Sequence, residues 1–193
     1  MVPERTASAT AWAQAFIAPV LIPGSVAVDA TAGKGLDTEF LARGVGAAGR
    51  VFAFDIQPGA LEITRQRLVT AGLLERVTLL LRDHAAMAAH VPPPVKAVMF
   101  NLGYLPGGDH RIITRPGTTL RALQDALALL APQGRLSLVV YTGHPGARQE
   151  QETLEEYVAQ LPPREYTVLR LAFWNRSPRA PVVILVEKAG GGS

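Results

Sequence analysis

Five short apolar runs, each rich in β-branched residues, alternate along the chain with segments of helical character. The runs begin at Val26, Val51, Val77, Val95 and Arg135. Their residues are apolar throughout rather than at every second position, which is typical of parallel strands covered on both faces. The pattern therefore predicts an α/β fold, a mostly parallel sheet with helices packed on both sides.

The segments between these runs carry helical periodicity. We expect helices over residues 10–18, 36–43, 59–70, 118–130 and 147–160. The fourth segment places leucines at helical spacing, so it should pack on the sheet. The last segment contains the acidic stretch EQETLEEY from Glu150, which we expect to form a solvated helix face turned away from any RNA.

The last 30 residues break this rhythm. Two strand-like runs, residues 166–173 and 181–188, are joined by a short polar segment with no helix between them. A β-hairpin is the simplest interpretation, and it brings the sheet to seven strands. A length of 193 residues fits one domain, which we expect over residues 1–189, followed by a flexible tail at 190–193.

Composition excludes several classes of protein. The apolar runs are far shorter than the roughly 20 residues that cross a bilayer, and the N-terminus lacks the features of a secretory signal. The absence of cysteine removes disulfides and thiolate ligands, and it fits a cytoplasmic location. The four histidines show no metal-ligand spacing, so no metal site is expected.

The segment VDATAGKGLDTEFLA, residues 28–42, joins the first strand to the first of the crossover helices. Ligands of open α/β sheets bind at such turns, beyond the carboxyl ends of the strands. Gly33 and Gly35 permit close approach of the backbone, and Asp29 can hold a cationic or hydroxyl-bearing group. The spacing lacks the third glycine of the dinucleotide fingerprint. A turn with two glycines is also common as a simple tight loop.

Acidic residues end the next two strands. Asp55 lies 20 residues after Gly35, where a carboxylate accepts hydrogen bonds from ribose hydroxyls. Asp83, followed by His84, ends the third strand, where a carboxylate can accept from an adenine amino group. Each acid alone is more often a helix cap. Three carboxylates at successive strand ends nevertheless favour a nucleoside-bearing cofactor.

The fourth strand ends at Asn101, whose amide offers both a donor and an acceptor. That combination suits a residue that holds a substrate amine while the lone pair of the amine faces a methyl group. In the loop that follows, Tyr104 can stack on a base, and Asp109 can position a nucleophile or receive its proton. The alternative is a plain turn at Pro106 and Gly107.

Several segments together resemble one family. They are DATAGKGLDTEFLA, NLGYLPGGDH, TLRAL, YTGHPG and the terminal VEK, and the similarity runs from about Trp12 to Lys188. The family is that of the putative rRNA methylases, now assigned as MnmM-type tRNA methyltransferases. The resemblance implies a Rossmann-like class I methyltransferase fold that uses S-adenosylmethionine. It implies N-methylation of the aminomethyl group of wobble 5-aminomethyl-2-thiouridine in the anticodon stem-loop of tRNA.

The resemblance also implies roles for individual residues. Those around the methionine half of the cofactor are Asp29, Ala30, Thr31, Gly33, Gly35, Asp37 and Thr38. Those around its ribose and adenine are Asp55, Ile56, Asp83 and His84. The acceptor site, which also borders the cofactor at Asn101, comprises Asn101, Leu102, Gly103, Tyr104, Leu105, Asp109 and His110. Those on the tRNA face are His144, Asn175, Arg176 and Arg179. Asn101 would orient the amine, and Asp109 or His110 would take its proton.

The sequence departs from the family pattern at three places. Lys34 replaces the usual asparagine, Ala147 replaces a glycine, and the hairpin segment WNRSPRAP carries two arginines. Two other functions stay open. One is the same fold acting on rRNA or on a small-molecule amine, and the other is an NAD-dependent oxidoreductase or a silent nucleotide-binding module. A homodimer is possible through the N-terminal helix or a sheet edge.

Overall fold

A computed structural model describes residues 3, 8–103, 116–143, 146–177 and 180–191 of the chain. Its seven strands form one sheet in the order β3-β2-β1-β4-β5-β7-β6. The strands are β1 (Val26–Asp29), β2 (Arg50–Asp55), β3 (Val77–Leu81), β4 (Val95–Leu102), β5 (Leu130–Val140), β6 (Tyr166–Leu171) and β7 (Val182–Lys188). All of the strands predicted from the apolar runs are present.

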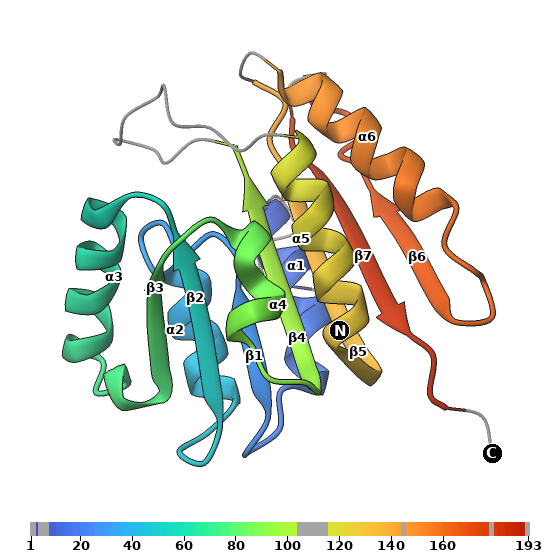
Figure 1. The fold of residues 1–193 in the computed structure, drawn as a ribbon. Coiled ribbons are helices and arrows are strands. Elements are labelled where there is room, and N and C mark those ends of the chain that lie inside the picture. The colour runs from blue at the N-terminus through green and yellow to red at the C-terminus, as the bar shows by residue number, and fades with distance from the viewer. Residues whose placement is uncertain (1–2, 4–7, 104–115, 144–145, 178–179, 192–193) are drawn as a thin grey trace.

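The first five strands are parallel to one another, and the last two form the predicted hairpin (Figure 1). β7 lies antiparallel between β5 and β6, so β6 runs parallel to β5 at the edge of the sheet. The carboxyl end of β6 therefore lies at the same edge of the sheet as those of β1, β2, β4 and β5. The predicted site residues that the structure describes lie at or next to this edge.

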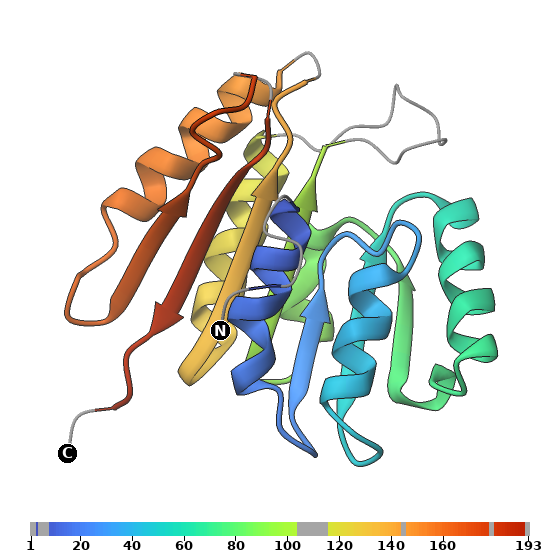
Figure 2. The same cartoon turned by 180° about the vertical axis from the view of Figure 1, so that it is seen from behind.

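Helices cover both faces of the sheet, as predicted (Figures 1 and 2). One face carries α1 (Ala9–Ile17), α2 (Leu36–Gly44) and α3 (Pro58–Thr70), and the other carries α4 (Met87–His90), α5 (Pro116–Leu129) and α6 (Ala147–Ala159). Short 3-10 turns occur at Ala18–Val20, Leu74–Arg76 and His84–Ala86. A separate buried apolar cluster lies on each side of the sheet, because the strands are apolar on both faces.

The N-terminal helix α1 has a side-chain cap at its start and contacts a strand of the sheet at its end. Ser8 caps its start by accepting a hydrogen bond from the Ala11 amide at 3.2 Å. At its end, Nη1 of Arg135 on β5 donates to the Phe16 carbonyl at 2.8 Å, and the same guanidinium lies 4.8 Å from the centre of the Phe16 ring. Nε of Arg135 is paired with Glu187 on β7 at 2.6 Å. These contacts set the position of α1 against the sheet.

The structure corrects the expectation about the acidic helix face. Glu150 in the first turn of α6 is 1% exposed, and it accepts a hydrogen bond from the Thr119 hydroxyl of α5 at 2.6 Å. α6 packs against α5, so Glu150 is enclosed, whereas Glu152 and Glu156 of the same acidic stretch are exposed. Charge spacing within one helix does not reveal a neighbouring helix that supplies a hydroxyl.

The start of one strand and the presence of one short helix also differ from the predictions. β5 begins at Leu130 rather than Arg135, because the buried Leu130 pairs with Val95 of β4 across a register shift. The leucine-rich run continues from helix into strand without a break signal. The short α4 and the turn before it were not predicted, since four helical residues show no periodicity. Among the described residues, no helix is both long and apolar enough to cross a membrane.

Candidate functional site

The loop from Ala30 to Gly35, between β1 and α2, has a backbone that depends on glycine. Gly33 and Gly35 have φ angles of 53° and 76°, in the left-handed region. A Cβ on Gly35 would lie 3.0 Å from backbone and side-chain atoms of Thr64 on α3. The Thr64 hydroxyl donates to the Gly33 carbonyl at 3.1 Å. The loop is thus held against α3 with no room for a side chain at Gly35.

Asp55, at the carboxyl end of β2, holds the loop from the other side. One carboxylate oxygen accepts from the Gly33 amide at 2.9 Å, and the other accepts from the Gln57 amide at 2.8 Å. Each oxygen keeps a further lone pair, so the half-buried carboxylate can still accept from two neighbouring hydroxyls. Ile56 and Leu36 are 49% and 57% exposed at this edge. A carboxylate beside exposed apolar side chains fits a nucleoside.

Asp29 and Asp37 place two buried carboxyl groups behind the loop. Asp29 accepts from the Thr31 amide at 3.0 Å and from the Thr38 hydroxyl at 2.6 Å. Burial, and next the charge of Asp37, raise the pKa of Asp29 to about 7. Burial also raises the pKa of Asp37. A cationic ligand would stabilise both carboxylates, so this pair of carboxyl groups fits the positively charged methionine half of S-adenosylmethionine.

Asn101 lies beside these acids at the carboxyl end of β4. Its backbone amide donates to the Thr31 hydroxyl at 2.7 Å, and its side-chain Nδ2 donates to Oδ2 of Asp37. Only the NH₂ side of an amide can face a carboxylate, so this bond assigns the orientation of the side chain. Oδ1 of Asn101 is buried and has no hydrogen-bond partner among the described residues. An acceptor is therefore available next to the predicted cofactor pocket.

One further member of this cluster, Gln14 on α1, was not predicted from the sequence. Its Nε2 donates to Oδ1 of Asp37 at 2.7 Å. The bonds link α1, α2, β1 and β4 through Gln14, Asp37, Asn101, Thr31 and Asp29. The sole local signal is a polar residue within an otherwise apolar helix, and that is too common to indicate a site.

Asp83 and His84 follow β3 on the side of the sheet that carries α4 and α5. Oδ1 of Asp83 caps the next turn by accepting from the Ala85 amide at 2.8 Å. The His84 ring lies with Nδ1 3.2 Å from the Ala30 carbonyl and edge-on to Phe100, and burial lowers its pKa. The neutral ring therefore contacts the loop that follows β1 through the Ala30 carbonyl. Contact of either residue with adenine stays a prediction.

The remaining predicted residues divide into two groups. Leu102 is buried at the end of β4, and Gly103 follows it. Asn175 and Arg176 lie in the connection between β6 and β7, where the Arg176 guanidinium is 5.0 Å from the centre of the Phe173 ring and the adjacent Trp174 is 99% exposed. The other predicted residues, Tyr104, Leu105, Asp109, His110, His144 and Arg179, lie outside the described part of the chain.

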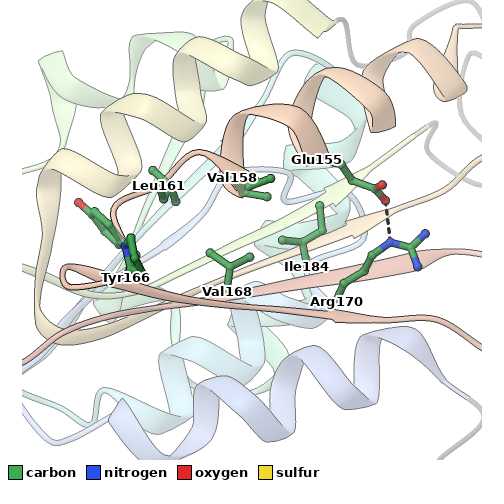
Figure 3. A pocket seen from close by; sticks show the side chains of 9 residues that line it. Glu155, Val158, Leu161, Tyr166, Val168, Arg170 and Ile184 are labelled. Carbon is green, nitrogen blue, oxygen red and sulfur yellow. Dashed lines mark hydrogen bonds and ion pairs between the residues drawn. The ribbon is translucent and has the colours of Figure 1, made fainter.

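A separate hollow of about 500 Å³ lies between α6 and the hairpin (Figure 3). Its walls are largely apolar side chains, among them Val158, Val168 and Ile184, and the ion pair of Glu155 with Arg170 at 3.0 Å lies at one end. None of the predicted site residues lines it. No cluster of three potential metal ligands occurs among the described residues.

Comparison with known proteins identifies relatives along most of the chain. The family model described as "Putative rRNA methylase" matches residues 51–187. A crystal structure of a putative rRNA-methylase from Clostridium thermocellum is 41% identical, with a TM-score of 0.91, and the match covers 94% of this chain and 97% of that one. A putative methyltransferase from Streptococcus mutans, solved in complex with SAH, is 34% identical, with coverages of 94% and 98% and a TM-score of 0.85.

A curated relative from Arabidopsis thaliana is named tRNA (mnm(5)s(2)U34)-methyltransferase, chloroplastic. It is 42% identical over 179 residues, which make up 88% of this chain, and the match spans 65% of that protein's length. A more distant O-methyltransferase from Thermotoga maritima, 22% identical with a TM-score of 0.61, shares the fold. The seven-stranded sheet with its antiparallel final strand is that of the class I methyltransferases.

Proposed function

The chain belongs to the putative rRNA methylase family, and from this we propose that it transfers a methyl group from S-adenosylmethionine to an amine on tRNA. The acceptor we propose is the aminomethyl group of wobble 5-aminomethyl-2-thiouridine, which becomes methylaminomethyl. The observation that carries the proposal is the Asn101 amide, with Nδ2 held by Asp37 and a buried, available Oδ1. The name of the Arabidopsis relative supports the choice of acceptor.

The residues around the glycine loop would hold the cofactor. When bound, S-adenosylmethionine supplies an electrophilic methyl group on a positively charged sulfur. Asp55 would accept from the ribose hydroxyls beside the apolar surface of Ile56. The Asp29 and Asp37 carboxylates would stabilise the positive charge of the methionine half. The family member solved with SAH supports this assignment.

The protein's contribution to the transfer is geometry and a neutral nucleophile. A C–N bond forms as the S–C bond breaks, so the amine must already have lost one proton to expose its lone pair. Oδ1 of Asn101 would accept one N–H of the amine and so direct that lone pair. Asp109 or His110 would take the proton, and both belong to the loop that follows β4.

The partner we propose is the anticodon stem-loop of tRNA, met in the cytoplasm. Asn175 and Arg176, beyond the carboxyl end of β6, lie at the same edge of the sheet as Asn101. A guanidinium there can contact phosphate. A homodimer is a further prediction, and sedimentation velocity at two protein concentrations would test it.

The decisive experiment is incubation with S-adenosylmethionine and tRNA that carries unmethylated 5-aminomethyl-2-thiouridine, followed by nucleoside mass spectrometry. We expect one added methyl group on that nucleoside and none on tRNA that lacks the aminomethyl group. Cofactor binding without methylation of any tRNA nucleoside would show that the acceptor is wrong, and rRNA and small amines would then be tested. Failure to bind the cofactor would overturn the proposal.

A further inference from the structure

Gln14 lies on α1, a helix that contains none of the residues predicted for the site, and yet its side chain reaches the middle of it. Nε2 of Gln14 donates to Oδ1 of Asp37 at 2.7 Å, while Oδ2 of the same carboxylate accepts from Nδ2 of Asn101. Asp37 thus uses one oxygen for each of two amides. Because Arg135 fastens the end of α1 to the sheet, the position of Gln14 is set by the fold.

An ionised carboxylate can only accept hydrogen bonds, so Asn101 must turn its NH₂ group toward Asp37. Oδ1 of Asn101 is then the atom left for the substrate. A protonated Asp37 would carry an O–H donor, for which Oδ1 of Asn101 is the natural acceptor. The amide would turn over and present Nδ2 to the substrate, and a donor cannot accept an N–H of the amine.

The ionisation of Asp37 therefore decides which face of Asn101 the substrate meets, and the groups around Asp37 oppose one another. Burial raises the pKa of Asp37, whereas the hydrogen bonds from Gln14 and then Asn101 lower it. The nearby Asp29 carboxyl on β1 shares the site, and its charge and that of Asp37 repel each other. Loss of Gln14 would remove the first of the two donors that favour the ionised form.

We propose that Gln14 is a positioning residue for methyl transfer, which holds Asp37 in the form that turns Oδ1 of Asn101 toward the acceptor amine. The proposal rests on the proposed function for the identity of the amine. It requires Gln14 to act through Asp37 and Asn101 without contact with substrate or cofactor. At a pH where Asp37 is ionised in both proteins, cofactor affinity should therefore be nearly independent of Gln14. Where Asp37 becomes protonated, the transfer step should depend on Gln14, and it is measured with saturating S-adenosylmethionine.

The test compares the single-turnover rate of methyl transfer in Gln14→Leu and in the wild-type protein as a function of pH. The amine titrates identically in both reactions, so the ratio of the two rates reports on the protein. We expect the ratio of the variant rate to the wild-type rate to fall as the pH is lowered. The decline of the transfer rate at acid pH should lie about one pH unit higher in the variant, as loss of one hydrogen bond to a charged group implies. At the alkaline end of the pH range, where Asp37 is ionised in both proteins, the dissociation constant of S-adenosylmethionine should agree within about twofold.

Gln151→Leu is the matched control, because Nε2 of Gln151 also donates to a carboxylate, that of Glu155, at 2.7 Å on α6. Its rate ratio should be flat with pH. Gln14→Glu keeps the side chain's shape and replaces the donor by a carboxyl, so it serves if Gln14→Leu does not fold. We expect the same direction of change and a larger displacement, because a third acid faces Asp37.

A second measurement does not depend on activity. The ¹³C resonance of the Asp37 carboxyl should titrate at a higher pH in Gln14→Leu than in the wild-type protein. A rate ratio that is flat with pH, or an unmoved titration, would overturn the role of Gln14. If the wild-type protein methylates no tRNA, the proposed function fails, and the carboxyl titration still decides whether Gln14 keeps Asp37 ionised.

Discussion

Asp55 and Asn101 are expected to serve different steps, which can be separated by two substitutions. Asp55→Ala removes the acceptor for the ribose hydroxyls and also frees the Gly33 and Gln57 amides. It should weaken cofactor binding by about 10- to 100-fold, as loss of hydrogen bonds to a charged group implies. Asn101→Ala should leave binding nearly unchanged and lower the rate of transfer by about 100-fold, because the amine loses its orientation.

Calorimetry with S-adenosylmethionine and single-turnover assays on both variants measure this division. The exposed Glu62→Ala on α3, whose partners Arg65 and Gln66 lie on the same helix, is the control and should change neither quantity. Equal loss of binding in the Asp55 and Asn101 variants would contradict the assignment of roles.

The buried Asp29 predicts a pH-dependent stability for the protein without cofactor. Its folded-state pKa of about 7 lies above the ordinary aspartate value of 3.8, so its contribution to stability is present below about pH 4 and is lost as the pH rises through 7. Asp29→Asn removes the buried charge. The variant should be more stable than wild type at pH 8, by on the order of 2–4 kcal/mol, and about equally stable at pH 4.

Urea unfolding at the two pH values measures this difference, and the titrations common to both proteins cancel in it. The same substitution should weaken S-adenosylmethionine binding at pH 8. A stability difference that does not change with pH would mean that folding does not raise the pKa of Asp29.

The contact between α5 and α6 is the clearest test at the level of secondary-structure elements. The Thr119 hydroxyl donates to Glu150 at 2.6 Å, and both residues are buried. Thr119→Val keeps the shape and leaves the carboxyl without this donor, so we expect a loss of about 1–3 kcal/mol in the free energy of unfolding. Thr153→Val, which removes an exposed hydroxyl on α6, should cost less than about 0.5 kcal/mol.

Denaturant unfolding of both threonine variants decides between an enclosed and a solvated Glu150. Equal, small losses would restore the solvated face that the acidic spacing predicts. The same comparison shows why the prediction of a solvated acidic face was wrong at Glu150. Helical periodicity predicted where α6 lies, whereas the burial of Glu150 depends on a hydroxyl 31 residues earlier in the chain.

The sheet as a whole brings the hairpin connection and Asn101 of the proposed acceptor site to one edge, which predicts a role for Arg176 in binding RNA. Arg176→Ala should weaken tRNA binding and make its dependence on salt shallower by about one counterion, with cofactor affinity unchanged. Arg43→Ala is the control, since Arg43 ends α2 at the opposite edge and is paired with Glu39. An unchanged salt dependence in Arg176→Ala would exclude a phosphate contact by this residue.

The pattern of residues along the chain predicted the parallel sheet, the terminal hairpin and the loops that carry polar residues, because apolar runs and turn residues act locally. It also indicated Asp29, Asp55 and Asn101, which end their strands at a common edge. Only the tertiary structure brought Gln14 to Asp37, 23 residues away, and Asp37 to Asn101, 64 residues away. The orientation of the Asn101 amide and the raised pKa of Asp29 follow from those contacts and from burial, which no spacing along a single segment records.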